Sequence, residues 1–128
     1  MAKTRVFISF DYDHDLDLKT LLVGQAKHED SPFEIADWSI KDESKTWRED
    51  ARKRIRASGV VVVMCGEYTD TATGVGVELA IAQTEQIPYF LLKGRSTKVC
   101  KLPTTVKTTD KLYNWTWDNL KNLIGGSR

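Results

Sequence analysis

An uncharged, β-branched run near the middle of the chain is the feature that most constrains its fold. Four valines, a methionine and a cysteine follow one another between Gly59 and Gly66. β-Branched residues favour strands, and a strand without polar alternation is usually buried on both faces, as in a parallel sheet covered by helices. We therefore expect Val60 to Met64 to form a central, buried strand.

Further strand-like and helix-like segments alternate around this run. Strand-like runs occupy residues 5–10, 33–38 and 88–92, and apolar residues recur at helical spacing from about residues 18, 47, 74 and 117. Residues 93–110 are interpreted as a loop, with or without an edge strand near Val106. This order predicts an α/β fold, a flavodoxin-like, doubly wound parallel sheet in three layers.

The composition fits a single globular domain and gives no sign of a nucleic-acid or membrane partner. The chain has 128 residues, a net charge of +1 and 41% hydrophobic residues. Its longest apolar run is too short to cross a bilayer, no signal peptide is visible, and its two cysteines lack a metal-binding spacing. We expect one cytoplasmic domain over residues 1–124, with 125–128 as a flexible tail or a cloning remnant.

Ligands of doubly wound sheets bind at the carboxyl ends of the strands, so the loops that follow the strands are the candidate ligand sites. The loop after the first strand holds Asp11, Asp13 and Asp15 and no glycine. These carboxylates would repel a pyrophosphate, which excludes a dinucleotide fingerprint, and no Walker pattern is present. A phospho-receiver domain would need an acceptor aspartate where the third strand ends in Cys65. Asp13 or Asp15 is expected to cap the next helix, and Mg²⁺ binding is the alternative.

Glu78 is the candidate catalytic residue. On a helical wheel it lies within an apolar arc, beside the stripe formed by Val75, Leu79 and Ala82. A carboxylate buried in this way is costly, and burial raises its pKa. Its place one turn into the helix directs it towards the expected ligand crevice. The structural alternative is a glutamate that accepts hydrogen bonds from amides at the helix start.

Several segments, taken in order, resemble one known family. They are Val6–Phe10, Asp37–Ser39, Trp47 with Arg52–Ile55, Ser58–Val63, Gly74–Ala82 and Ile87–Pro88. Together they resemble the TIR-like family, which includes the TIR proteins of the bacterial Thoeris antiphage system. The resemblance implies a flavodoxin-like fold and NAD glycohydrolase or ADP-ribosyl cyclase activity, with Glu78 at the catalytic position.

The resemblance also implies a substrate site for NAD, with no metal or other cofactor. We expect Phe10, Asp11, Trp38, Ser39 and Trp47 to bind the substrate. Family members often carry a tryptophan four residues before the catalytic glutamate, where this chain has Gly74. The missing wall of the site is expected to come from Trp38, Trp47 or Tyr68.

The sequence leaves open both the product of NAD cleavage and the class of function. Attack by water on the ribosyl carbon would give ADP-ribose, whereas attack by the substrate's adenine would give a cyclic product. The resemblance implies a homo-oligomer built through TIR–TIR contacts, with the polar loop 39–45 reaching a neighbour, and a diffusible nucleotide product that acts on an effector. The alternatives are a non-catalytic interaction module and a sensor that binds a nucleotide without cleaving it.

Overall fold

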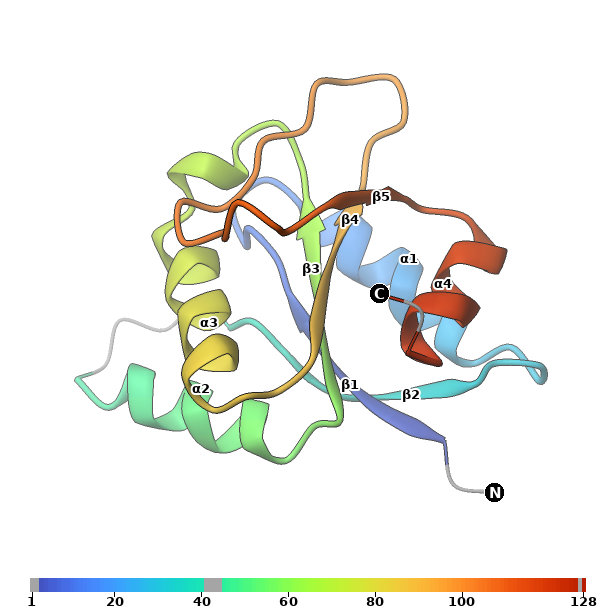
Figure 1. The fold of residues 1–128 in the computed structure, drawn as a ribbon, viewed down its shortest axis with the longest axis horizontal. Helices are drawn as coiled ribbons and strands as arrows, with labels where there is room; N and C mark the ends of the chain where they lie inside the picture. The colour runs from blue at the N-terminus through green and yellow to red at the C-terminus, as the bar shows by residue number, and fades with distance from the viewer. Residues whose placement is uncertain (1–2, 41–44, 127) are drawn as a thin grey trace.

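A five-stranded parallel sheet forms the centre of the computed structural model, which describes residues 3–40, 45–126 and 128 (Figure 1). The strand order is β2-β1-β3-β4-β5. The strands are β1 (Thr4–Ser9), β2 (Phe33–Trp38), β3 (Val60–Cys65), β4 (Tyr89–Lys93) and β5 (Leu112–Asn114). The helices are α1 (Leu16–Ala26), α2 (Trp47–Arg56), α3 (Thr73–Thr84) and α4 (Trp117–Ile124), and a 3-10 turn, η1 (Thr69–Thr71), precedes α3.

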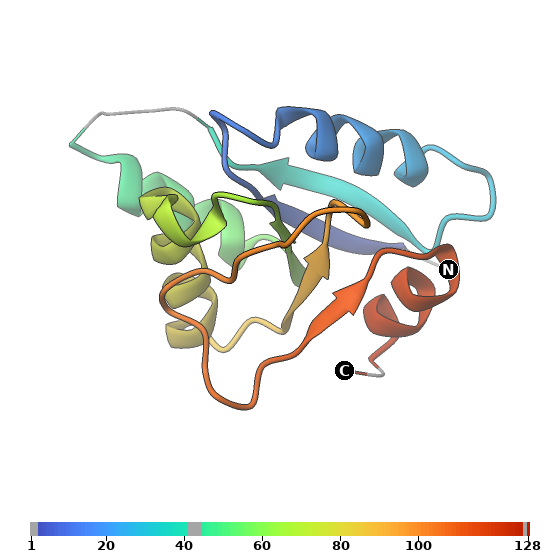
Figure 2. The same cartoon turned by 90° about the horizontal axis from the view of Figure 1, so that it is seen from above.

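Strand β3 lies at the centre of the sheet, as its uncharged sequence predicts, and all its residues are buried. Because successive side chains point to opposite faces, its residues divide between two cores. Val60, Val62 and Met64 pack with residues of α1 and α4, whereas the alternate residues pack with α2 and α3. Figure 2 shows these helix pairs on opposite sides of the sheet. The predicted flavodoxin-like, three-layer α/β fold is confirmed.

The edge strand lies elsewhere than predicted. Val106 belongs to a turn in which its amide bonds to the Pro103 carbonyl, and the fifth strand is Leu112–Asn114, paired with β4 from Leu91 to Lys93. Of the two alternatives for this stretch, the structure shows the loop without a strand near Val106. The proline and the polar residues around Val106 favour turns, and its apolar side chain packs against the α2–α3 core instead of a ladder.

Asp15 occupies the position before α1, as the capping prediction requires, but its side chain makes no capping hydrogen bond. Its Oδ1 instead accepts a hydrogen bond of 3.0 Å from Arg95 in the segment after β4. The carboxylate is 1% exposed and lies against Gly66, where an added Cβ would clash with it. Among the described residues, no group of three potential ligands could hold a metal ion. Asp15 therefore joins α1 to a distant loop.

The remaining observations concern the cysteines, membrane-spanning helices and the polar loop. Cys65 is fully buried, as expected of a small apolar residue, and burial raises the pKa of its thiol to about 12. Neither cysteine forms a disulfide. Within the ranges described, no helix has the length and apolar character needed to cross a membrane. Most of the polar loop expected to reach a neighbouring subunit, residues 41–44, lies outside the described residues.

Candidate active site

A pocket of about 410 Å³ lies where β1 and β2 end and α3 begins. This is the carboxyl edge of the sheet, the place at which doubly wound folds bind ligands. Its lining brings together most of the residues that the sequence singled out. They are Phe10, Asp11, Ser39, Trp47 and Glu78, and Tyr12, His14 and the first turn of α3 lie beside them.

Glu78 is 2% exposed and points from α3 back towards the ends of β1 and β2. Its Oε1 accepts hydrogen bonds from the hydroxyl groups of Ser9, at 2.8 Å, and Ser39. Ser39 also accepts the amide N–H of Phe10 at 3.1 Å, which fixes its own position. The two serines hold one carboxylate oxygen in place, so the orientation of the whole group is set.

The second oxygen of Glu78 is free to meet a ligand. Within the part of the chain that the structure describes, no group donates a hydrogen bond to Oε2. Since Glu78 lines the pocket, Oε2 is the oxygen that faces it.

The environment of Glu78 combines opposing electrostatic effects. Burial is the largest, and it raises the pKa of this carboxyl to about 7. Hydrogen bonds from Ser39 and Ser9 favour the ionised form and limit the rise, as does the more distant charge of Arg54. Arg54 itself pairs with Asp37 of β2 at 3.3 Å. Glu78 can therefore carry a negative charge near neutral pH inside a largely apolar helix face.

Trp47 lies beside Gly74 at the edge of the pocket. A Cβ at Gly74 would lie 3.6 Å from the indole of Trp47, so this ring occupies the space beside the first turn of α3. Both residues line the pocket that contains Glu78. The indole at the start of α2 thus gives the pocket an aromatic face beside the first turn of α3.

The other aromatic candidates lie outside this pocket. Trp38 is 36% exposed and packs under the ammonium group of Lys19 on α1, 4.6 Å from the ring centre. Strand alternation explains its position, because Trp38 and Ser39 point to opposite faces and Ser39 takes the face of α3. Tyr68 is also exposed, and its ring packs at a tilt against that of His14, with ring centres 4.4 Å apart.

Two residues that sequence reasoning did not assign to the site belong to it. Ser9 bonds directly to Glu78, and His14 lines the pocket with its Nδ1 2.7 Å from Asp11 Oδ2. Strand alternation could have indicated Ser9, since it shares a face with the buried Phe7. The spacing of Asp11 and His14 gave a weaker signal, because it acquires meaning only when the turn is formed.

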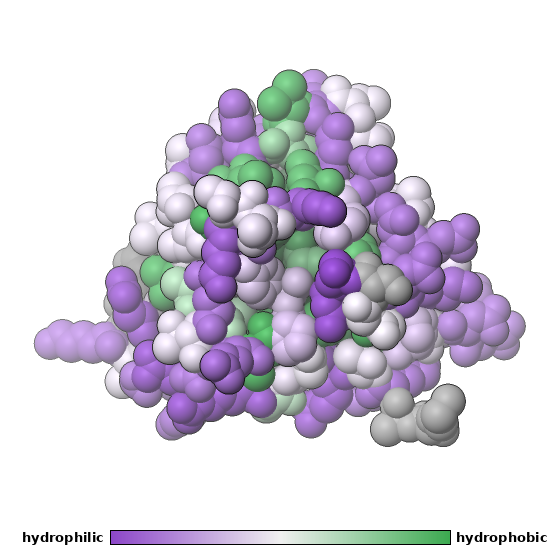
Figure 3. Space-filling model, viewed as in Figure 1, coloured by the Kyte–Doolittle hydropathy of each residue, from purple (hydrophilic) through white to green (hydrophobic). Residues whose placement is uncertain are grey.

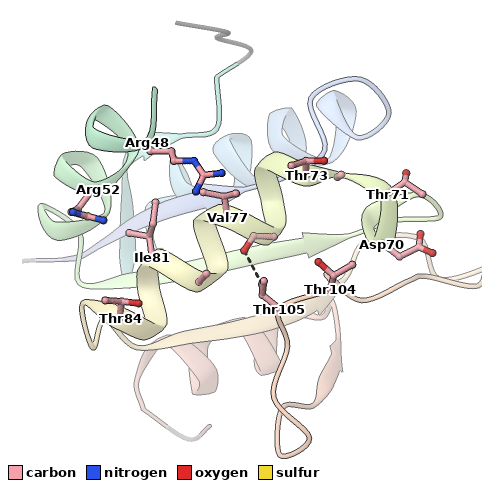
Figure 4. Close-up of a pocket in the computed structure, with 13 residues that line it drawn as sticks. Arg48, Arg52, Asp70, Thr71, Thr73, Val77, Ile81, Thr84, Thr104 and Thr105 are labelled. Atoms are coloured by element: carbon pink, nitrogen blue, oxygen red, sulfur yellow. Dashed lines mark hydrogen bonds between the residues drawn. The ribbon is translucent and has the colours of Figure 1, made fainter. Parts of the chain in front are cut away.

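A second pocket, of about 390 Å³, lies on the outer side of α3, next to the first pocket at residues 71–73 (Figure 4). Arg48 and Arg52 border it from α2, and Val77 and Ile81 form part of its floor. Some of its polar side chains bond within the protein. Thr105, for example, donates to a backbone carbonyl of α3 at 2.7 Å. Glu78 does not line this pocket, so the first pocket is the candidate reaction site.

The parallel sheet, its covering helices and a buried glutamate at the carboxyl edge define a TIR-like α/β protein. The family model described as Thoeris protein ThsB, TIR-like domain, matches residues 7–97, well over half of the chain. The chain therefore belongs to this family, and its membership supports a role in antiphage defence. No curated protein sequence matches the chain closely enough to be called a relative.

Proposed function

We propose that this protein cleaves NAD at the bond between nicotinamide and ribose, and that Glu78 stabilises the positive charge that develops on the ribosyl group. The observation that carries the proposal is the state of Glu78. It is almost fully buried, one oxygen is held by two serines, and the other faces a pocket at the carboxyl edge of the sheet. Membership of the TIR-like Thoeris family supports it, because enzymatic members of that family act on NAD.

The chemistry needs few groups. The nicotinamide–ribose bond breaks through an oxocarbenium-like state, as in glycoside hydrolysis, and the bonding electrons leave with the nicotinamide nitrogen. Nicotinamide leaves as a neutral molecule and needs no acid. A fixed carboxylate next to the ribose stabilises the cation more in the transition state than in the ground state, which is the condition for catalysis.

The surrounding residues would position the dinucleotide. Trp47 offers a face on which a flat ring could stack, and Ser39 and Asp11 would offer oxygen atoms to the ribose hydroxyl groups. Phe10 closes the floor of the pocket. Trp38 is not part of this proposal, because it lies against Lys19. We further propose that the product is a diffusible nucleotide that signals to an effector during antiphage defence.

The test is to incubate the purified protein with NAD over a range of protein concentrations and to follow nicotinamide by chromatography. Mass spectrometry of the second product distinguishes ADP-ribose from a cyclic nucleotide. The proposal expects nicotinamide in stoichiometric amounts with one of these products. Binding of NAD without any nicotinamide release, from protein shown to self-associate, would contradict it and would favour a nucleotide sensor.

A further inference from the structure

We propose that His14, oriented by Asp11, is the base that removes the proton from the water molecule that attacks the ribosyl carbon. The inference rests on the proposed NAD cleavage and adds a second catalytic residue to the same pocket. His14 and Asp11 both line the pocket that contains Glu78. The histidine lies in the turn between β1 and α1. Three hydrogen bonds from backbone amides in this turn fix the position of its partner, Asp11.

Asp11 is the fixed member of this pair. Asp11 is 7% exposed. Its Oδ1 accepts a hydrogen bond from the amide N–H of Asp13 at 3.1 Å, and its carbonyl accepts one from the amide N–H of Asp15 at 2.8 Å. Its remaining oxygen, Oδ2, lies 2.7 Å from His14 Nδ1. A carboxylate cannot donate a proton to that nitrogen when ionised, so the hydrogen bond assigns the proton to Nδ1. Nε2 of a neutral ring is then the acceptor.

The imidazole ring is held on a second side as well. It packs against Tyr68 with ring centres 4.4 Å apart and a tilt of 31° between the ring planes, and this contact adds to the hydrogen bond with Asp11 in restricting its rotation. Among the residues placed by the structure, none forms a hydrogen bond with Nε2. A base needs this combination of a fixed tautomer, a fixed ring and an unoccupied nitrogen at a ligand pocket.

Glu78 is poorly suited to take this proton. Its Oε1 already accepts two hydrogen bonds, and its Oε2 has to remain negative to stabilise the ribosyl cation. If Glu78 accepted the proton, the charge would be lost while it is needed. The pocket thus separates the two tasks, with charge stabilisation on α3 and proton removal on the turn after β1.

The hydrolytic step balances with these groups. The bond between the ribosyl carbon and the nicotinamide nitrogen breaks, and its electron pair leaves with nicotinamide. The oxygen of water bonds to the carbon, and one of its protons passes to His14 Nε2. The side chain of His14 is 46% exposed, so the proton then leaves to solvent. The products are nicotinamide, ADP-ribose and one proton.

A nucleophile without a proton provides the test, because it has no need of a base. With 3-acetylpyridine, wild-type protein is expected to exchange nicotinamide for the added pyridine, and no proton has to be removed. The test compares the rates of hydrolysis and exchange in the same sample for wild type, His14→Asn and Asp11→Asn. Asparagine at position 14 can still donate to Asp11 from its amide, and the ratio of the two rates does not depend on the fraction of folded protein.

His14→Asn is expected to slow hydrolysis by about 10²-fold, the lower end for general base catalysis, while exchange changes by less than about twofold. Asp11→Asn is expected to lower the same ratio less, because it disturbs only the tautomer and orientation of the ring. Equal losses of hydrolysis and exchange in His14→Asn, or no loss of hydrolysis, would overturn the role of His14. Either result would leave the proposed NAD cleavage standing. Wild-type protein that releases no nicotinamide with either nucleophile would overturn both this inference and the proposed function.

Discussion

At the scale of single residues, the site depends on a balance between the burial of Glu78 and its two serine donors. Burial favours the protonated carboxyl and raises its pKa to about 7, whereas Ser39 and Ser9 favour the carboxylate. The other charged groups that influence it, Arg54 and Asp37, form a pair with each other and act in opposite directions. Catalysis by an ionised Glu78 should therefore increase as the pH rises through the neutral range.

Ser9→Ala tests this balance. The loss of one donor to the carboxylate should raise the pKa of Glu78 further, so the acid limb of the pH–rate profile should move to higher pH. We expect a shift of about one pH unit, equivalent to a hydrogen bond of about 1.4 kcal/mol. Ser58→Ala is the matched control, because Ser58 is also buried but bonds to the Ile55 carbonyl, away from the pocket. A profile that does not move in Ser9→Ala would show that its hydroxyl does not support the charge.

Trp47→Ala tests the aromatic wall. If the indole stacks on the substrate, its loss should raise the KM for NAD about tenfold, which corresponds to about 1.4 kcal/mol of stacking energy, with little change in kcat. Trp47→Phe should restore most of the affinity. Trp38→Ala serves as the control, since this tryptophan lies against Lys19 and does not line the pocket. Equal KM changes in Trp47→Ala and Trp38→Ala would rule out the stacking role.

At the scale of elements, Arg95 connects the segment after β4 to the start of α1. Its guanidinium donates to Asp15, to both carboxylate oxygens of Asp17 and to the carbonyl of His14. Burial raises the pKa of Asp15, and Arg95 opposes this effect by favouring the carboxylate. Since the carbonyl of His14 is among its acceptors, Arg95 also steadies the turn that borders the pocket.

Arg95→Gln should destabilise the fold because it leaves the Asp15 carboxylate buried without a counter-charge. The expected cost is about 2 kcal/mol in the free energy of unfolding, below the usual cost of breaking a fully buried pair because Arg95 is partly exposed. Adding Asp15→Asn should recover part of the loss, since it removes the uncompensated charge. Urea denaturation of both variants at pH 7 measures the effect. Additive losses in the double variant would contradict an interaction between these two residues.

The elements also show which features of the fold the sequence could reveal. The uncharged run of β3 and the apolar stripe of α3 are local patterns, so the central strand and the burial of Glu78 could be predicted from them. Strand β5 has only three residues, too few for a periodic signal, and it was missed. The local pattern predicts that Asp13 or Asp15 caps α1. The bond between Asp15 and Arg95 could not be predicted, because Arg95 is far away in the sequence.

The candidate site was partly predictable, because some of its residues follow local sequence patterns and others depend on contacts between distant segments. Glu78, Ser39 and Trp47 could be named from their places at strand ends and helix starts, and the structure brings them together in one pocket. The position of Trp47 over Gly74 depends on how α2 packs on α3, which no local pattern shows. His14 becomes part of the site only through the turn that pairs it with Asp11.

At the scale of the whole molecule, the pocket is small for its proposed substrate. A volume of about 410 Å³ is near the lower end for pockets that enclose drug-sized ligands, and NAD, with two nucleosides and a diphosphate, is larger than these. Part of the dinucleotide would extend past the exposed ring of Tyr12. The face shown in Figure 3 is dominated by polar side chains, with apolar atoms in small separate areas.

Activity should therefore depend on self-association. A neighbouring copy that covers the exposed part of NAD would complete the site, so the specific activity should rise with protein concentration. Nicotinamide release per mole of protein is measured across the concentration range in which light scattering reports assembly. Constant specific activity from protein that stays monomeric throughout this range would contradict the expectation.

The most direct measurement of the central claim is NAD cleavage by Glu78→Gln, with Glu85→Gln as the matched control. Glutamine keeps the shape of Glu78 and can bond to the serines but lacks the charge, so nicotinamide release should fall on the order of 10²-fold or more. Glu85 lies at the end of the same helix and pairs with Arg56 at the surface, so its variant should stay close to wild type. Above pH 7, Glu78→Gln should unfold no more easily than wild type, because it removes a buried charge. A folded Glu78→Gln protein that cleaves NAD at the wild-type rate would contradict the account.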